Sequence, residues 1–114
     1  MDDRVAKAFR AQLTAERVRL AGEIGEAIEV PDQMTYGSQA AAASQVFDQQ
    51  RDLALRERSV QHLAQVDAAL ARLDDGTFGV CIRCGREIAP ARLEALPWAA
   101  YCIDCQTAID RGQR

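Results

Sequence analysis

The chain has 114 residues, a formal net charge of −3, 48% hydrophobic residues and only 5% aromatic residues. That length fits one compact domain, or one long helical element beside a small module. Few aromatic side chains and abundant alanine favour helices that pack through Ala and Leu over a broad globular core. An acidic chain gains little from the phosphate attraction behind non-specific nucleic-acid binding, so that class of function fits poorly.

The first residues, Met1-Asp2-Asp3-Arg4, are charged, and no apolar segment follows them. We therefore expect no secretory signal, no membrane partner and a cytoplasmic location.

Residues 3–29 are predicted to form a first helix. Apolar residues recur along one stripe of it, mostly at a spacing of four: Val5, Phe9, Leu13, Leu20, Ile24 and Ile28. Gly22 and Gly25 lie in its distal part, where each costs about 1 kcal/mol relative to alanine. We expect this end to be the more mobile one, or to be approached closely by another helix.

A break follows at residues 31–43, which are rich in Pro, Gly, Ser and Ala. Because the residue before Pro31 is disfavoured in the α region, the first helix should end there.

A second helix is predicted over 39–74, ended by Gly76, which adopts the left-handed conformation at low cost. A near-heptad apolar seam follows it: Val46, Leu53, Val60, Leu63, Val66, Leu70 and Leu73. Two such helices should fold back as an antiparallel rod of about 40 Å, their stripes packed together.

All four cysteines form two Cys-x2-Cys pairs, Cys81–Cys84 and Cys102–Cys105, separated by seventeen residues. This spacing is typical of a tetrahedral zinc site, and four thiolates leave no open position, so one structural Zn²⁺ is expected. The alternatives are two disulfides, which need an oxidising compartment, or a redox Cys-x-x-Cys, which leaves the second pair unexplained.

The predicted fold is therefore all-α. An antiparallel two-helix coiled-coil hairpin occupies 1–75, with its tip at 31–43, and a four-cysteine zinc finger with a short C-terminal helix occupies 76–114. Pro90 and Pro97 should break the segment between the cysteine pairs, and Trp98 should lie near the metal. A module this small relies on zinc for folding free energy, on the order of 10 kcal/mol.

No constellation of residues predicts catalysis. His62 is the only histidine and has no readable nucleophile beside it, so a place on the surface or in the seam is expected. The carboxylates Glu23, Glu26 and Glu29 should form a solvated helix face, because acid–base work needs a cleft. We predict that the protein is not an enzyme.

Three arginines, Arg83, Arg86 and Arg92, are expected to surround the zinc. Their simplest role is to balance the net charge of −2 on a four-thiolate site. The alternative is a zinc ribbon that grips DNA, although the basic patch is thin for that purpose.

The segment from Phe78 to Cys105 resembles the zinc-finger signature of the DksA/TraR family, with Ile88, Arg92 and Pro97 at the family's spacing. Ile82 departs from it, since an acidic or small polar residue is usual there. The resemblance covers roughly residues 45–105.

The resemblance implies a bacterial factor that binds RNA polymerase directly, without contacting DNA. In that family the coiled-coil rod enters the secondary channel of the polymerase. Its tip reaches toward the active centre and changes the stability of open promoter complexes.

The family's best-known members carry an Asp-x-x-Asp-x-Ala motif at the tip, which falls here on residues 38–43. Ser38 and Ala41 stand where the aspartates would be, and only Ala43 matches. Tip contacts with a partner are assigned to Tyr36, Ser38, Ala41 and Ala43. The acidic tip is absent, so the chain is expected to bind polymerase without the usual effect at promoters.

Family members that respond to guanosine tetraphosphate use basic residues that fall here on Gln65, Leu96 and Gln106. None of these is basic, so no direct binding of that alarmone is expected. The leading prediction is a polymerase-binding transcription regulator. The rivals are an interaction module of the same fold with another protein partner, and the DNA-binding zinc ribbon.

Overall fold

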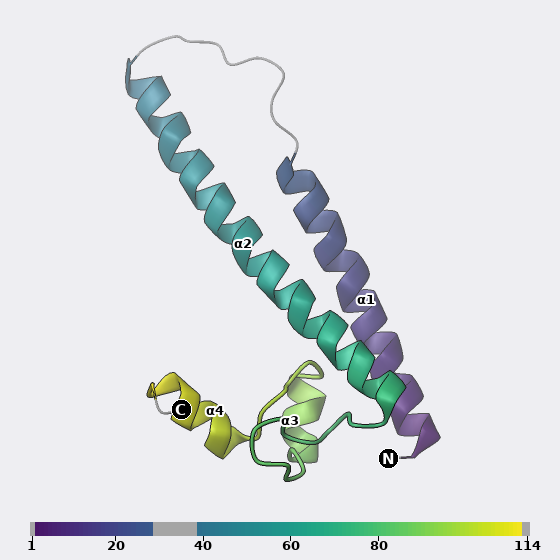
Figure 1. Ribbon diagram of the computed structural model, residues 1–114. Coiled ribbons are helices and arrows are strands. Elements are labelled where there is room, and N and C mark those ends of the chain that lie inside the picture. Colours follow the sequence, from purple (N-terminus) through teal and green to yellow (C-terminus); the bar gives the residue numbers. More distant parts are fainter. Residues whose placement is uncertain (1, 29–38, 113–114) are drawn as a thin grey trace.

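The computed structural model describes residues 2–28 and 39–112, with side chains for 2–25 and 45–112. Two long helices, α1 (Asp3–Ile28) and α2 (Gln39–Asp75), lie side by side as an antiparallel hairpin (Figure 1). Two short helices, α3 (Pro90–Ala95) and α4 (Ile103–Asp110), belong to the compact module at the base of the hairpin. The predicted all-α hairpin with a four-cysteine module is confirmed. No helix within the described residues is long and apolar enough to cross a membrane.

Local interactions explain where the long helices begin and end. Asp2 accepts the backbone N–H of Arg4 on its side chain, 3.1 Å away, at the start of α1. At the other end of the rod, Gly76 has a φ of 82°, which glycine tolerates. This turn lets the backbone N–H groups of Thr77 and Phe78 donate to the carbonyl of Arg72, which satisfies the end of α2.

Two ion pairs between the arms give the register of the hairpin. Arg10 Nη2 lies 2.6 Å from Asp74 Oδ1, and Arg17 Nε lies 2.7 Å from Asp67 Oδ1. In both pairs the residue numbers add to 84, as expected for antiparallel helices that keep one register. On this register Ile28, the last residue of α1, lies opposite position 56 of α2.

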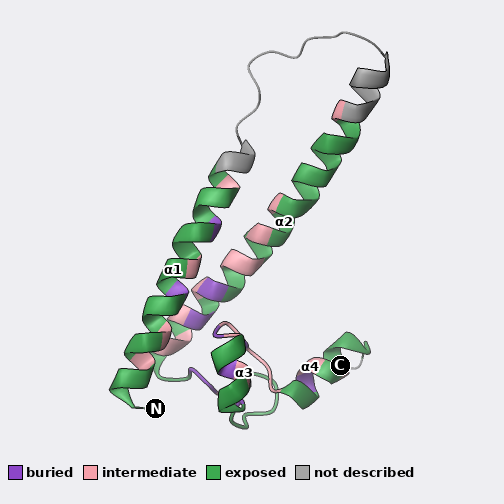
Figure 2. Cartoon of the chain, turned by 180° about the vertical axis from the view of Figure 1, so that it is seen from behind, coloured by how far each residue is buried: buried purple, intermediate pink, exposed green. Residues whose placement is uncertain are grey.

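The core occupies the base of the rod and the module beneath it (Figure 2). Leu13 and Leu20 of α1 meet Val66 and Ala69 of α2, and all four are at most 2% exposed. The module adds six further buried residues: Phe78, Cys81, Ile88, Leu93, Ala99 and Cys105. Phe9 of α1 contacts Phe78, with ring centroids 5.1 Å apart, and thereby joins the two groups.

The predicted seam of α2 is wrong in its upstream half. Val46, Leu53 and Val60 are 52%, 61% and 45% exposed, whereas Val66 is fully buried. The register explains the first two, because they precede position 56 and therefore have no counterpart in α1. On α1, Val5 in the first turn is also exposed, at 43%.

The module contains more helix than predicted. Pro90 begins α3 rather than breaking the chain, because its fixed φ and missing N–H suit the first position of a helix. Downstream, the predicted short C-terminal helix is α4, which begins at Ile103, directly after Cys102.

Candidate metal centre

The four cysteines converge from two parts of the module. The first pair lies on a tight turn in which Gly85 N donates to the carbonyl of Cys81 at 2.9 Å, and Gly85 has a φ of 77°. A bridge between Val80 and Glu87 closes this turn. The second pair lies at the start of α4, where Cys102 is the N-cap and Cys105 is in the first turn.

The sulfur geometry suits a single tetrahedral metal. All four Sγ atoms lie within 4.8 Å of one another, and Cys84 Sγ is 3.7 Å from Cys102 Sγ. Four sulfurs that are each about 2.3 Å from one Zn²⁺ lie about 3.8 Å apart. No disulfide joins these cysteines. The chain therefore has a four-cysteine site for one zinc ion, formed by the four predicted ligands Cys81, Cys84, Cys102 and Cys105.

The protein supplies positive groups to the thiolates. Burial acts to raise the pKa of Cys81, but backbone N–H groups of Cys102, Cys84 and Arg83 outweigh it and lower that pKa to about 6. The guanidinium of Arg83 acts to lower the pKa of Cys105, yet burial and the three neighbouring thiols raise it to about 11. Four adjacent thiols thus resist losing all their protons unless a cation is present, which is the role of zinc at such a site.

Two of the three arginines predicted around the metal contact thiol groups. The side chain of Arg83 hydrogen-bonds Cys105, which raises the pKa of Arg83, and Arg86 does the same with Cys84. Arg92 instead donates from Nε to the carbonyl of Tyr101 at 3.0 Å and so holds the backbone before Cys102. The position of Arg92 in the sequence motif does not distinguish a hydrogen bond to the backbone from a role in balancing the charge of the thiolates.

Arg72, near the end of α2, links the rod to the finger through hydrogen bonds. Its carbonyl accepts the backbone N–H groups of Thr77 and Phe78, and its Nη2 lies 3.5 and 3.4 Å from the carbonyls of Trp98 and Ala99. Burial lowers the pKa of Arg72. Sequence reasoning did not single out Arg72, and only its place one turn before Gly76 hints at the role.

Trp98, expected beside the metal, packs its indole ring against His62 of α2. The ring centroids are 4.3 Å apart and the rings are perpendicular. His62, predicted for the surface or the seam, is half-buried at this contact between rod and finger. Tyr36 and Ser38 of the predicted tip lie outside the described residues, and Ala41 and Ala43 belong to the first turns of α2.

The three positions that the family resemblance aligned with alarmone contacts lie around one cavity. Gln65, Leu96 and Gln106 line a space of about 450 Å³ between the rod and the finger. Arg72 and Arg92 also line it, but both donate to backbone carbonyls of the finger.

The sequence and the fold were compared with known proteins. Residues 76–111 match the model of the prokaryotic dksA/traR C4-type zinc finger. A protein of Caulobacter vibrioides named RNA polymerase-binding transcription factor DksA is 31% identical over 116 residues, covering 100% of this chain and 82% of that protein. The protein of the same name from Haemophilus influenzae is 34% identical over 104 residues, 90% of this chain and 72% of its own length.

Solved structures agree with these relatives. The transcription factor DksA2 from Pseudomonas aeruginosa superposes with a TM-score of 0.75 at 32% identity, covering 97% of this chain and 87% of that one. An RNA polymerase-binding protein and transcriptional regulator from Chlamydia trachomatis shares the fold, with a TM-score of 0.63 at 20% identity. The finger signature, the hairpin and relatives that extend over the whole chain therefore lead to one conclusion: this protein belongs to the DksA/TraR family of zinc-finger proteins.

Proposed function

We propose that this protein binds bacterial RNA polymerase through the secondary channel and regulates transcription without contacting DNA. The observation that carries this proposal is the relation to RNA polymerase-binding transcription factors along both rod and finger. The protein acts as a binding factor and not as an enzyme, and its zinc is structural.

The shape of the molecule supports entry into a channel. Its principal extents are 59 × 33 × 20 Å, and the rod extends away from the finger (Figure 1). The wide end carries the zinc finger and most of the core, while the distal part of α2 projects beyond the register of α1. A rod anchored at one end can reach into a passage while the base remains outside.

The charges of the finger argue against the DNA-binding rival. Arg83 and Arg86 contact thiol groups, and Arg92 donates to a backbone carbonyl. The chain as a whole carries a net charge of −3, which disfavours binding to the phosphates of DNA. Duplex binding that weakens steeply with added salt would favour the DNA-binding rival instead.

The alanine-rich tip sets this protein apart from family members with two tip aspartates. We propose that Tyr36, Ser38, Ala41 and Ala43 make the contacts near the active centre, and that their effect on promoters is weak. The neutral positions Gln65, Leu96 and Gln106 leave the protein without a direct guanosine tetraphosphate site.

The direct test is a titration of labelled protein into purified bacterial RNA polymerase core, with and without a competitor for the secondary channel. Saturable binding that the competitor displaces is the expected result. Binding that the competitor leaves unchanged would place the contact elsewhere on the polymerase. Absence of binding at micromolar concentrations would favour the rival function, an interaction module with a different protein partner.

A second test concerns the tip. Ser38→Asp combined with Ala41→Asp should strengthen the effect on open promoter complexes, measured as complex lifetime. The matched control is Ala11→Asp with Thr14→Asp, which adds the same two charges at the same spacing on an exposed part of α1. An equal change in both double variants, or none in either, would remove the mechanism from the tip.

A further inference from the structure

An Asp-Gly pair, Asp75-Gly76, lies at the point where the rod passes into the finger. Asp75 is the last residue of α2, and Gly76 makes the turn that follows it, with a φ of 82°. Both residues are exposed. The sequence contains no other Asp-Gly pair and no asparagine, so no deamidation competes with the chemistry of this pair.

An Asp-Gly pair can rearrange without an enzyme or an oxidant. The backbone nitrogen of the glycine attacks the side-chain carboxyl carbon of the aspartate, a C–N bond forms, and the amide proton leaves with the carboxyl OH as water. Water then adds to the main-chain carbonyl of the resulting succinimide and breaks its bond to that nitrogen. The chain is now linked through the aspartate side chain, as isoaspartate. Glycine favours the attack because no Cβ hinders its nitrogen or restricts the backbone.

Two features of the structure oppose this reaction at Asp75. Its Oδ1 accepts the hydroxyl of Thr77 and also the backbone N–H of Thr77, at 3.0 Å. These hydrogen bonds lower the pKa of Asp75, so the neutral carboxyl group, which loses its oxygen as water, is scarce near neutral pH. The helical backbone at Asp75 must also rotate before the ring can close.

The rearrangement would disturb the link between rod and finger. The carbonyl of Arg72 accepts the backbone N–H groups of Thr77 and Phe78, at 2.9 and 3.1 Å, across the turn at Gly76. Isoaspartate adds one carbon to the main chain between that acceptor and the two donors. The two hydrogen bonds cannot then keep their present geometry, so the finger is held less firmly.

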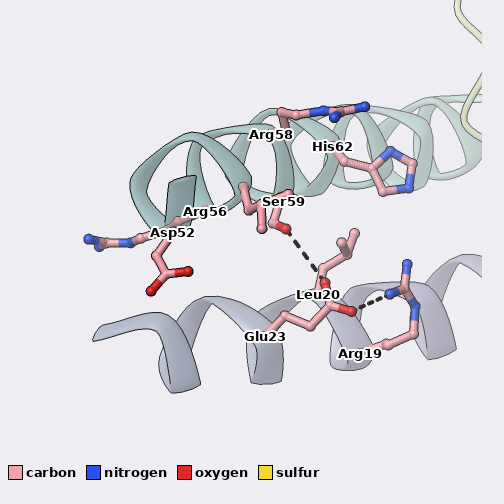
Figure 3. A pocket seen from close by; sticks show the side chains of 9 residues that line it. Arg19, Leu20, Glu23, Asp52, Arg56, Arg58, Ser59 and His62 are labelled. Carbon is pink, nitrogen blue, oxygen red and sulfur yellow. Dashed lines mark hydrogen bonds and ion pairs between the residues drawn. The ribbon is translucent and has the colours of Figure 1, made fainter. Parts of the chain in front are cut away.

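Asp52 is the opposite case within the same helix. Figure 3 shows it on the side of α2 that faces α1, where it lines a cleft of about 750 Å³ between the arms. Leu53 follows it, and the helix continues on both sides. A branched side chain on the attacking residue and a continuous helix both hinder ring closure, so Asp52 serves as an internal reference.

We propose that Asp75-Gly76 is a site of isoaspartate formation whose rearrangement Thr77 suppresses while the finger is packed against the rod. Local opening of the turn removes the hydrogen bonds of Thr77 and lets the backbone of Asp75 rotate. Isoaspartate therefore accumulates in molecules whose finger has loosened, and the modified site is a substrate for a methyltransferase that esterifies isoaspartyl carboxyl groups. The proposal concerns the isolated protein and does not depend on polymerase binding.

A pair of variants at Thr77 tests the protection directly. The zinc-loaded full-length protein is incubated near neutral pH, and isoaspartate is measured by enzymatic methylation and by mass spectrometry that separates the isomeric peptides. Thr77→Val removes the hydroxyl at nearly constant volume and should speed isoaspartate formation at Asp75 several-fold. Thr77→Ser, the matched control, keeps the hydroxyl and should react at the wild-type rate. Melting curves verify that both variants are folded.

Removal of zinc provides the second measurement. A chelator should raise the rate at Asp75 in the wild type, because the finger depends on the metal for its folding free energy. The peptide that contains Asp52 should stay unmodified under the same conditions. Equal rates in folded wild type and folded Thr77→Val, a wild-type rate that urea leaves unchanged, or isoaspartate forming as fast at Asp52 as at Asp75 would each overturn the proposal.

Discussion

The base of the molecule and the distal part of α2 differ in how their apolar side chains are used. At the base, Leu13 and Val66 are fully buried between the arms, and the finger adds its own buried residues beneath them. Along the distal part, Phe47 and Leu53 are 73% and 61% exposed. Burial thus fixes the base as a folded unit, while the distal apolar side chains remain available to a partner.

Removal of a zinc ligand should give the largest effect, because two of the six buried residues of the finger, Cys81 and Cys105, are themselves predicted ligands. Cys84→Ser removes one of four thiolates, and structural zinc contributes on the order of 10 kcal/mol to folding in small modules. We expect the finger to unfold and the base of the rod to loosen with it. Circular dichroism at 222 nm with a zinc-release assay measures both, and an unchanged helical signal and melting temperature would contradict the prediction.

A pair of leucine truncations compares the two regions directly. Leu13→Ala removes a fully buried side chain and should lower the free energy of unfolding by about 2–5 kcal/mol. Leu53→Ala removes one that is 61% exposed and should change it by less than about 0.5 kcal/mol. Urea unfolding of both variants measures the difference, and similar losses would mean that the distal part is covered in solution.

Glycines on α1 offer a smaller, stabilising change. No described atom lies within 4 Å of a Cβ built at Gly22 or Gly25, so, of the two alternatives predicted for this end, a close approach of another helix is not seen in the described structure. Gly22→Ala should therefore stabilise the helix by up to about 1 kcal/mol. Thermal melting tests this, with Ala21→Gly as the reverse control at the adjacent exposed position.

The smallest expected effect concerns the ion pair between Arg17 and Asp67. Both side chains are close to half exposed, so solvent screening limits the pair to less than about 1 kcal/mol. Exchanging the two residues should preserve the stability, whereas Asp67→Arg alone brings two arginines together and should lower it slightly. A double-mutant cycle in low and high salt measures the coupling, and a coupling independent of salt would contradict a surface interaction.

Much of this architecture could be predicted from periodicity and spacing. The parts of the helical stripes near the base, the left-handed Gly76 and the four ligands depend on local patterns, and the structure contains them. The exposure of Leu53 could not be predicted, because the same heptad spacing is compatible with any register between the arms. The register depends on pairs such as Arg10 and Asp74, which are distant in sequence.

The contacts within the finger were harder to predict for a similar reason. The sequence predicts a break at Pro90, although proline also suits the first position of a helix. A helix forms there because Leu93 is buried in the core. Arg72 and Trp98 meet across 26 positions of sequence, and no local pattern signals such a contact.

Because the register of the hairpin is constant, the number of residues in each arm sets the distance from the zinc site to the tip. Each arm lengthens by about 1.5 Å per residue, and seven residues amount to nearly two whole helical turns. Inserting one heptad into both arms above the base would therefore carry the tip about 10 Å farther from the zinc while keeping the same faces together. Family members could thus differ in reach through paired insertions that leave the base unchanged, and the distance from metal to tip becomes a quantity that is set by chain length alone.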